Sequence, residues 1–357
     1  MSKLVTVLVT GVGGRSVGHQ ILHALTLVRE KYRLIATDVD SFSFGLYQAD
    51  AAYIVPRADA ADYVPAIGEL INREHVQVIL PGTEPELRAL VANRETVEKA
   101  GVLLLASALD VVQMCSNKLR LYDWLQRNGF IAPRTANAGN WHQLIQRTGF
   151  PLVGKPTEET GGSRNVAILT NEGEVERYLE ENKGSREVLL QEYVGSPEQE
   201  YTVGVMISKS GEVIDSIVMH RKLVGLSLGA SRQWEGRNYA LSTGYSQGTI
   251  VKHPQIQETC EQLAASIGIQ GPANIQCRLS GRGVTILEVH PRFSGTTSIR
   301  GDVGFNEPDT LIRNYVLDES FGRLQYQFDV AAIRAFQTQI VPLKTMNNLP
   351  KVSSARR

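Results

Sequence analysis

The sequence has 357 residues, with 37 basic and 37 acidic side chains and therefore no formal net charge. This length is enough for two or three domains with large buried cores. A neutral chain lacks the overall positive field with which proteins attract duplex nucleic acid, so we expect no nucleic-acid partner. The three cysteines lie far apart in the sequence, which favours a reducing compartment over a disulfide framework.

The N-terminus shows no signal peptide, because its apolar run is short and ends in a Thr-Gly pair. No stretch approaches the roughly 20 apolar residues that a membrane-spanning helix needs. We therefore predict a soluble, cytoplasmic protein without a membrane partner.

Residues 1–107 alternate between strand and helix patterns. This rhythm predicts a doubly wound parallel sheet. We expect strands at residues 4–10, 33–37, 52–55, 76–80 and 102–106, and helices at residues 17–30, 59–73 and 84–99.

The first turn of this region is rich in glycine, from Gly11 to Gly18, and Asp38 ends the second strand. Glycines at such a turn let the backbone approach an anion, and an acid about 20 residues further on can hold a ribose. This pattern supports a nicotinamide-dependent dehydrogenase. The glycine spacing is loose, however, and a structural turn or a site for a different ligand explains it better.

Two lysines in the next region are candidates for binding an anion. Lys118 lies in the first turn of a helix for which Ser116 is the expected N-cap. A lysine is unfavourable near the positive end of a helix, so a bound anion would explain it, although a solvated lysine is the simpler alternative. Lys155 ends a strand at residues 150–156. The small residues Gly161-Gly162-Ser163 follow and suit either a mobile flap over phosphates or an ordinary hairpin loop.

From residue 200 onward the pattern becomes antiparallel. Residues 273–279 and 285–290 form a predicted β-hairpin around a Ser-Gly-Arg-Gly turn. Side chains alternate along a strand, so Glu288, His290 and Arg292 share one face. A three-residue loop places Gln276 opposite Glu288, at a distance suited to a shared metal ion, whereas a two-residue loop turns Gln276 to the other face.

These motifs, in this order, resemble those of the ATP-grasp superfamily, and in particular its carbamoyl-phosphate-synthase-like branch. The resemblance covers roughly residues 1–320. It rests on a lysine, a Lys-Pro pair, a Gly-Gly-Ser loop, a Glu-Tyr-Val segment, a glutamine and a Glu-x-x-Pro-Arg motif. It implies a fold of mixed α/β and α+β class, in which a doubly wound pre-ATP-grasp sheet precedes a two-lobed ATP-grasp domain.

The resemblance also implies roles for residues that match the family's motifs. ATP phosphates would be contacted by Lys118, Lys155, Gly161, Gly162 and Ser163, the adenine by Glu192, Tyr193 and Val194, and the ribose by Glu200. The metal, Mg²⁺ or Mn²⁺, would be held by Gln276, Glu288 and His290. Arg292 would assist at the transferred phosphoryl group, with Arg300 and Arg221 as weaker candidates to anchor a carboxylate substrate.

His290 is the one departure, because family members commonly carry asparagine at this position. Imidazole is a nitrogen ligand that suits Mn²⁺ or Zn²⁺ better than Mg²⁺. As a ligand, His290 would shift the metal preference or make metal binding sensitive to pH. The alternative is that it only hydrogen-bonds to a neighbour, and it ranks below Glu288 and Gln276.

The predicted boundaries follow from this resemblance. Residues 1–107 would form the pre-ATP-grasp domain, residues 108–195 the linker helix and small lobe, and residues 196–340 the C-terminal lobe with the metal site. We expect residues 341–357 to be a disordered tail.

The implied activity is that of an enzyme, an ATP-dependent carboxylate–amine or ammonia ligase. It would form a carbon–nitrogen bond through an acyl phosphate and release ADP. Its partners would be a small carboxylate and an amine, and a homodimer is an open alternative for its assembly. The competing hypotheses are a dehydrogenase that uses the glycine-rich turn, and a non-catalytic ATP-binding module.

Overall fold

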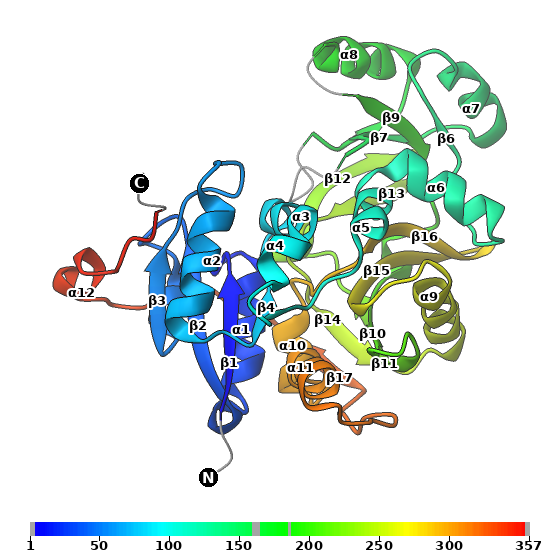
Figure 1. Cartoon of the computed structure of the whole chain (residues 1–357). Coiled ribbons are helices and arrows are strands. Elements are labelled where there is room, and N and C mark those ends of the chain that lie inside the picture. The colour runs from blue at the N-terminus through cyan, green and yellow to red at the C-terminus, as the bar shows by residue number, and fades with distance from the viewer. Residues whose placement is uncertain (1–3, 159–164, 185–186, 354–357) are drawn as a thin grey trace.

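The computed structural model describes residues 4–158, 165–184 and 187–353. Three sheets of four or more strands organise this part of the chain, and each is the centre of one structural unit (Figure 1). The predicted flap, Gly161-Gly162-Ser163, lies outside the described residues.

The first unit, residues 4–107, is called the N-terminal domain here. Its five strands are parallel and follow the order β3-β2-β1-β4-β5, as the predicted doubly wound sheet requires. Every residue of β1 is buried, because apolar cores cover both faces of the sheet. The elements are β1 (Val5–Thr10), α1 (Val17–Thr26), β2 (Tyr32–Asp38), β3 (Ala51–Ile54), α2 (Tyr63–Glu74), β4 (Val78–Leu80), α3 (Glu84–Ala92), α4 (Arg94–Glu98) and β5 (Leu103–Leu104).

Two helices then lead to a small lobe, residues 133–192. The helices are α5 (Leu109–Ser116) and α6 (Lys118–Arg127). The cap of α6 is Asn117, whose side chain accepts hydrogen bonds from two backbone N–H groups, while the expected cap, Ser116, is instead the last residue of α5. The lobe has an antiparallel sheet of order β6-β9-β7-β8. It comprises β6 (Thr135–Ala136), α7 (Trp141–Thr148), β7 (Leu152–Pro156), β8 (Ala167–Leu169), α8 (Glu172–Asn182) and β9 (Val188–Glu192).

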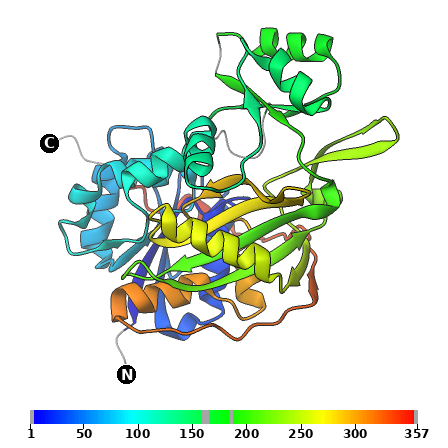
Figure 2. The same ribbon diagram turned by 90° about the vertical axis from the view of Figure 1, so that its right-hand side faces the viewer.

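The third unit, called the C lobe, is built on an antiparallel sheet of order β16-β15-β10-β11-β14-β17. Helix α9 covers one face of this sheet, and a hairpin of β12 and β13 projects from the lobe (Figure 2). The elements are β10 (Glu200–Ile207), β11 (Val213–Arg221), β12 (Leu228–Trp234), β13 (Arg237–Ser242), β14 (Gly248–Val251), α9 (Pro254–Ser266), β15 (Gly271–Ser280), β16 (Gly283–His290), α10 (Thr297–Asp302), α11 (Glu307–Leu317) and β17 (Val330–Ala332).

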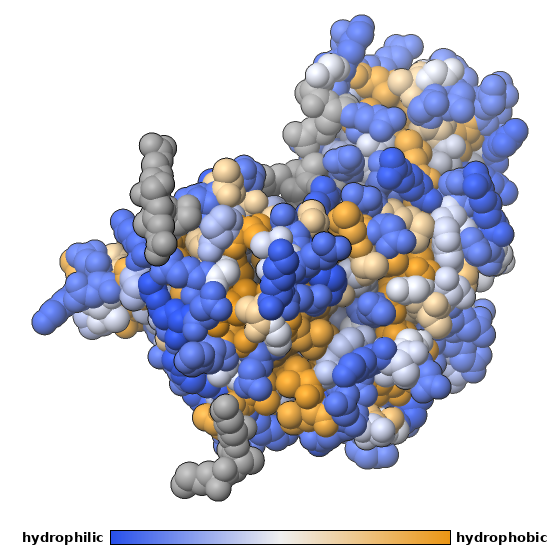
Figure 3. All heavy atoms as spheres, viewed as in Figure 1, coloured by the Kyte–Doolittle hydropathy of each residue, from blue (hydrophilic) through white to orange (hydrophobic). Residues whose placement is uncertain are grey.

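The N-terminal domain and the C lobe share one hydrophobic core. Helix α1 packs against α10 and α11, and a single cluster runs from Val7 and Leu25 to Met219 and Phe305. Apolar residues are also visible on the surface near this junction (Figure 3). The other face of the C-lobe sheet is therefore turned toward the N-terminal domain, away from α9.

The C-terminal segment differs from the disordered tail that we expected. Residues 343–347 form helix α12 (Leu343–Asn347), and Lys351 then forms a parallel bridge with Ile54 at the open edge of β3. Backbone hydrogen bonds of 2.8 and 2.9 Å join Ile54 to Pro350 and Val352, and the Val352 side chain is buried. An unpaired sheet edge offers free backbone groups, and this polar segment pairs with them at Lys351.

Over residues 4–158, 165–184 and 187–353, no helix is both long enough and apolar enough to cross a bilayer.

Candidate active site

The hairpin of β15 and β16 places Gln276 opposite Glu288, although its loop is the shorter of the two alternatives. Ser280 pairs with Gly283, so the loop has two residues rather than three. A β-bulge at Leu287 then inserts one extra residue into β16 and restores the register beyond it. The pairing is therefore present with a two-residue loop, which without the bulge would turn Gln276 to the other face.

Glu288 lies at the centre of a group of charged side chains on the face turned toward the N-terminal domain. Lys118 Nζ is 3.8 Å from Glu288 Oε1, and His290 Nε2 is 3.2 Å from Glu288 Oε2. Burial by itself would raise the pKa of Glu288, but the charges of Lys118, His290 and Lys155, together with the hydrogen bond from His290, hold it well below its ordinary value. Glu288 is therefore an anion at neutral pH.

Lys155 approaches the same carboxylate from the small lobe. It lies on β7, is buried, and donates a hydrogen bond of 2.8 Å to the hydroxyl of Tyr122. Burial lowers the pKa of Lys155 to about 7, and the positive charges of Lys118 and Arg278 add to this effect while Glu288 opposes it. Two lysines that are 37 positions apart in the sequence thus converge on Glu288.

Arg292 is held by a carboxylate that the sequence did not reveal as a site residue. Its Nε donates to Glu84 Oε2 at 3.0 Å, and Glu84 begins helix α3 of the N-terminal domain. The same carboxylate accepts hydrogen bonds from Ser116 and Arg88. Burial would raise the pKa of Glu84, but Arg292 and His290 lower it to about 2. The two residues are 208 positions apart, and nothing in the local pattern around Glu84 pointed to this contact.

Glu200 lies between two arginines on adjacent strands. Arg221 on β11 and Arg278 on β15 flank it in one row across the sheet, with donor–acceptor distances of 2.9 and 3.0 Å. Arg278 also donates to the carbonyls of Val194 and Ala240, so it links the C lobe to the end of β9. Sequence reasoning missed Arg278, although its position two residues after Gln276 was available as a signal.

The predicted adenine and ribose residues are close together but already engaged. Glu192 accepts a hydrogen bond of 2.7 Å from the backbone N–H of Arg134 and is paired with Arg282. Tyr193 donates to the carbonyl of Ala240 at 2.8 Å and lies under the guanidinium of Arg278. The Val194 carbonyl and the Glu200 carboxylate both contact Arg278. Their roles toward a nucleotide stay predictions.

Arg300 is not exposed to a substrate, in contrast to its assigned role as a carboxylate anchor. It is 1% exposed, and it donates to Glu307 at 2.8 Å and to Asn274 at 2.7 Å. Gly204 lies directly beneath this ion pair, because a Cβ there would come within 2.4 Å of both Arg300 and Glu307. Arg221 is likewise buried and bound to Glu200. We therefore interpret both arginines as structural.

The hairpin residues fit a divalent cation that is completed by a nucleotide. Glu288 supplies an ionised oxygen, and Gln276 supplies an amide on the paired strand. Mg²⁺ is usually held by one or two carboxylates together with phosphates and water, rather than by a cage of protein ligands. The described residues contain no group of three or more His, Cys, Asp and Glu side chains that could hold a metal ion. His290 contacts Glu288, and its place as a metal ligand stays a prediction.

The glycine-rich turn of the N-terminal domain has a packing explanation. A Cβ on Gly11 would lie 2.2 Å from Glu86 Oε2, and one on Gly18 would lie 2.3 Å from the Thr10 carbonyl. Gly11 also has a φ of +58°. Close contact between β1, α1 and the turn before α3 therefore requires these glycines, whether or not a ligand binds there.

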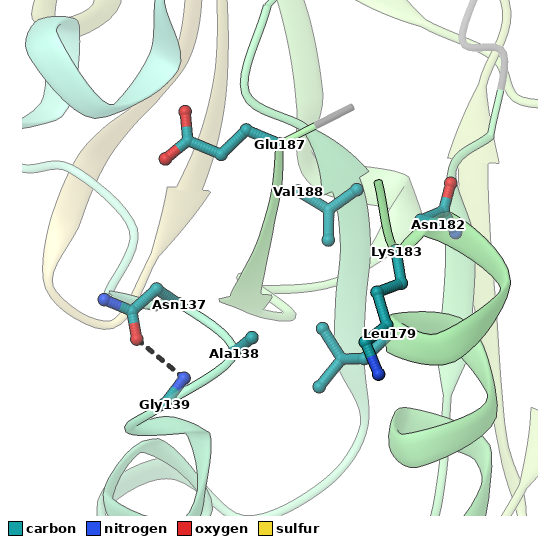
Figure 4. A pocket seen from close by; sticks show the side chains of 8 residues that line it. All are labelled: Asn137, Ala138, Gly139, Leu179, Asn182, Lys183, Glu187 and Val188. Atoms are coloured by element: carbon teal, nitrogen blue, oxygen red, sulfur yellow. Dashed lines mark hydrogen bonds between the residues drawn. The ribbon is translucent and has the colours of Figure 1, made fainter. Parts of the chain in front are cut away.

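A surface pocket of about 310 Å³ lies in the small lobe, separate from the residues described above. The loop before α7, with Asn137 and Gly139, lines one side, and the end of α8, with Leu179 and Lys183, lines the other (Figure 4). None of the predicted site residues lines this pocket, so we do not connect it with the chemistry at Glu288.

Comparison with protein families gives two matches that together span most of the chain. A model of the N-terminal domain of PylC-like proteins matches residues 7–105. A model described as ATP-grasp in the biosynthetic pathway with Ter operon matches residues 184–336.

Among curated proteins, the chain is similar to large chains of carbamoyl phosphate synthase. The protein of Pseudomonas syringae pv. tomato is 26% identical over 206 residues, which cover 56% of this chain and 18% of the relative. The protein of Methanosarcina acetivorans is 22% identical over 307 residues, which cover 81% of this chain and 28% of the relative. The chain thus spans less than a third of the length of these relatives.

Among solved structures, the fold is similar to two nucleotide complexes. An ADP complex of N5-carboxyaminoimidazole ribonucleotide synthetase has a TM-score of 0.65 at 17% identity, and the match covers 91% of this chain and 81% of that one. The second is the biotin carboxylase domain of Hydrogenobacter thermophilus 2-oxoglutarate carboxylase, solved with MgADP and bicarbonate. It has a TM-score of 0.64 at 18% identity, and the match covers 91% of this chain and 73% of that one. These similarities show the fold.

Proposed function

The chain belongs to the ATP-grasp superfamily, and from this premise we propose that it is an ATP-dependent carboxylate–amine ligase. The observation that carries the proposal is the convergence of Lys118 and Lys155 on Glu288. The linker helix and the small lobe each bring one cation to the ionised carboxylate of the C lobe. Two buried lysines beside one carboxylate leave an excess of positive charge when Lys155 is protonated, and a polyphosphate would balance that charge.

The proposed reaction has two steps. A substrate carboxylate oxygen attacks the γ-phosphorus of ATP, which yields an acyl phosphate and ADP. The nitrogen of an amine or ammonia then attacks the carbonyl carbon, and inorganic phosphate leaves. Phosphoryl transfer depends mainly on alignment and on neutralising the charge of the transferred group. A divalent metal would neutralise part of that charge when bound.

The residues have separate tasks in this proposal. Lys118 and Lys155 would bind the phosphates, while Glu288 and Gln276 would hold the metal. Arg292 would stabilise the transferred group, and Glu84 would orient Arg292 through the contact at 3.0 Å. In the free protein Lys118 partly neutralises Glu288, and a bound nucleotide would replace that contact with one between lysine and phosphate.

Two structural neighbours, a ribonucleotide synthetase and a biotin carboxylase domain, were solved with ADP or MgADP. They support ATP and Mg²⁺ as the cofactors proposed for this chain, with Mn²⁺ as the alternative that His290 suggests. The identity of the carboxylate and the amine is the open part of the proposal, and a homodimer stays a prediction.

A screen of ADP release tests the proposal. The purified chain is incubated with ATP, pairs of small carboxylates and amines, and either Mg²⁺ or Mn²⁺. We expect ADP and phosphate, rather than AMP and pyrophosphate, to appear only when both substrates are present. Glu288→Gln should abolish this release while the protein stays folded by circular dichroism. Glu69→Gln, which removes a partly exposed carboxylate paired with Arg73, is the matched control and should keep full activity.

Formation of AMP would refute the acyl-phosphate route. Saturable binding of Mg·ATP without ADP release for any pair would favour the alternative of a non-catalytic nucleotide-binding module.

A further inference from the structure

The hydroxyl of Tyr122 lies between the small lobe and the C lobe. Tyr122 is four residues after Lys118 in α6, so both side chains are on the same face of this helix. The side chain is 2% exposed. Burial, followed by the negative charge of Glu288, raises the pKa of this hydroxyl well above its ordinary value, so the group stays protonated.

Three hydrogen-bonding partners surround this hydroxyl, and each comes from a different strand. Lys155 on β7 lies 2.8 Å away, Gln191 Oε1 on β9 lies 3.0 Å away, and the Leu287 carbonyl on β16 lies 2.8 Å away. An ammonium group can only donate, so the hydroxyl accepts from Lys155 when that lysine is charged. Its single hydrogen is then available to Gln191 or Leu287, and the hydroxyl joins both lobes.

The partner on β16 is the bulge residue itself. Leu287 is the extra residue that the bulge inserts, and it directly precedes Glu288. A bulge leaves its extra residue out of the regular strand ladder, so the Leu287 carbonyl is free to accept a bond from the side. Tyr122 supplies that bond. The hydroxyl thus contacts the backbone next to Glu288 and the Nζ atom of Lys155 at the same time.

We propose that Tyr122 is a positioning residue, which holds Lys155 and the Glu288 segment in the arrangement that receives the phosphates of a nucleotide. This inference rests on the proposed function, because it assigns Lys155 to the phosphates. In the part of the chain that the structure describes, the Tyr122 hydroxyl is the one acceptor recorded for Lys155. Without the hydroxyl, Lys155 would lose its hydrogen-bond acceptor and could move away from Glu288. The Leu287 carbonyl would lose the hydrogen bond from Tyr122.

The test compares two ligands that differ only in their phosphates. Calorimetry measures the binding of a non-hydrolysable Mg·ATP analogue and of adenosine to the wild type and to Tyr122→Phe. We expect the analogue to bind about tenfold more weakly to the variant, as for the loss of one hydrogen bond to a charged group, and adenosine to bind equally well. A purely structural role would weaken both ligands alike or only lower the melting temperature.

A double-mutant cycle adds a second readout. If Tyr122 acts through Lys155, Tyr122→Phe should change the affinity for the analogue by less than twofold when Lys155 is already methionine. Tyr315→Phe is the matched control, because the Tyr315 hydroxyl also has three hydrogen-bonding partners, which are the backbone groups of Gly271, Ser208 and Ile207 in the C lobe. It should leave the affinity for the analogue unchanged.

The outcomes separate the inference from the proposed function. Equal affinities of wild type and Tyr122→Phe for the analogue overturn the inference while leaving the nucleotide site in place. If the effects of Tyr122→Phe and Lys155→Met on the affinity for the analogue simply add, then Tyr122 does not act through Lys155. Failure of the wild type to bind the analogue at all overturns the proposed function, and the role of Tyr122 is rejected with it.

Discussion

The low pKa of Lys155 predicts that nucleotide binding depends steeply on pH. In the free protein burial brings this pKa to about 7, so the lysine is half charged at pH 7. A bound phosphate would favour the charged form and raise the pKa toward the ordinary value of about 10.4. Binding then takes up a proton, and the affinity should fall as the pH rises above 7.

The magnitude follows from the fraction of charged Lys155 in the free protein. This fraction falls from about one half at pH 7 to about one hundredth at pH 9, so the affinity should fall by up to about 50-fold, or about 2.3 kcal/mol. The free energy of unfolding should change in the opposite direction. The unfolded chain binds this proton up to a pH of about 10.4 and the folded chain only up to about 7, so stability rises with pH between these values.

The assay is a series of calorimetric titrations with Mg·ADP between pH 6 and 9 in buffers of different ionisation enthalpy, which report both affinity and proton uptake. Lys155→Met should bind more weakly at pH 6 and lose most of the pH dependence. Lys209→Met, which removes an exposed lysine paired with Asp318, should keep it. An affinity that stays constant between pH 7 and 9 in the wild type, without proton uptake, would refute the reasoning.

Three further substitutions test the structure around the site. Glu84→Gln should lower kcat about 10- to 100-fold with a smaller effect on nucleotide affinity, because Arg292 loses a charged partner. Equal losses in kcat and in affinity would contradict a role of Glu84 through Arg292. Glu200→Gln should lower the free energy of unfolding by about 3–5 kcal/mol in denaturant titrations, since two buried arginines lose their shared carboxylate. A change below about 1 kcal/mol would argue against a structural role for these ion pairs. Gly204→Ala should destabilise by about 1–3 kcal/mol, because its Cβ would overlap the Arg300–Glu307 pair, and an unchanged melting temperature would show that the pair can shift.

The N-terminal sheet could be predicted from the sequence because its strands are buried on both faces. Such strands read as continuous apolar runs separated by helix-period segments, and all five expected strands are present. The hairpin around Gly283 could be predicted because two apolar, β-prone runs flank a Ser-Gly-Arg-Gly turn. The order of motifs from Lys118 to Arg292 pointed to the ATP-grasp family, and the family comparisons agree.

The details that define the site depend on contacts that local patterns do not encode. The bulge at Leu287 is one inserted residue, and no turn signal marks it. The Glu84–Arg292 contact needs the N-terminal domain to dock on the C lobe. The pairing of Glu200 with Arg221 and Arg278 needs the order of three strands, which explains why Arg221 is a buried partner of a carboxylate rather than an open anchor. Arg300 is buried for another reason, because α10 and α11 bring it to Glu307. The pairing of Lys351 likewise depends on the free edge of β3.

The central claim is that Lys118, Lys155 and Glu288 form one nucleotide site. The most direct measurement is a competition titration of the wild type with Mg·ATP and NADH, repeated with the Lys118→Met and Lys155→Met variants. We expect saturable binding of Mg·ATP that NADH does not displace, and at least tenfold weaker binding in each lysine variant. Tight binding of NADH without saturable binding of Mg·ATP, or unchanged Mg·ATP affinity in both variants, would contradict it.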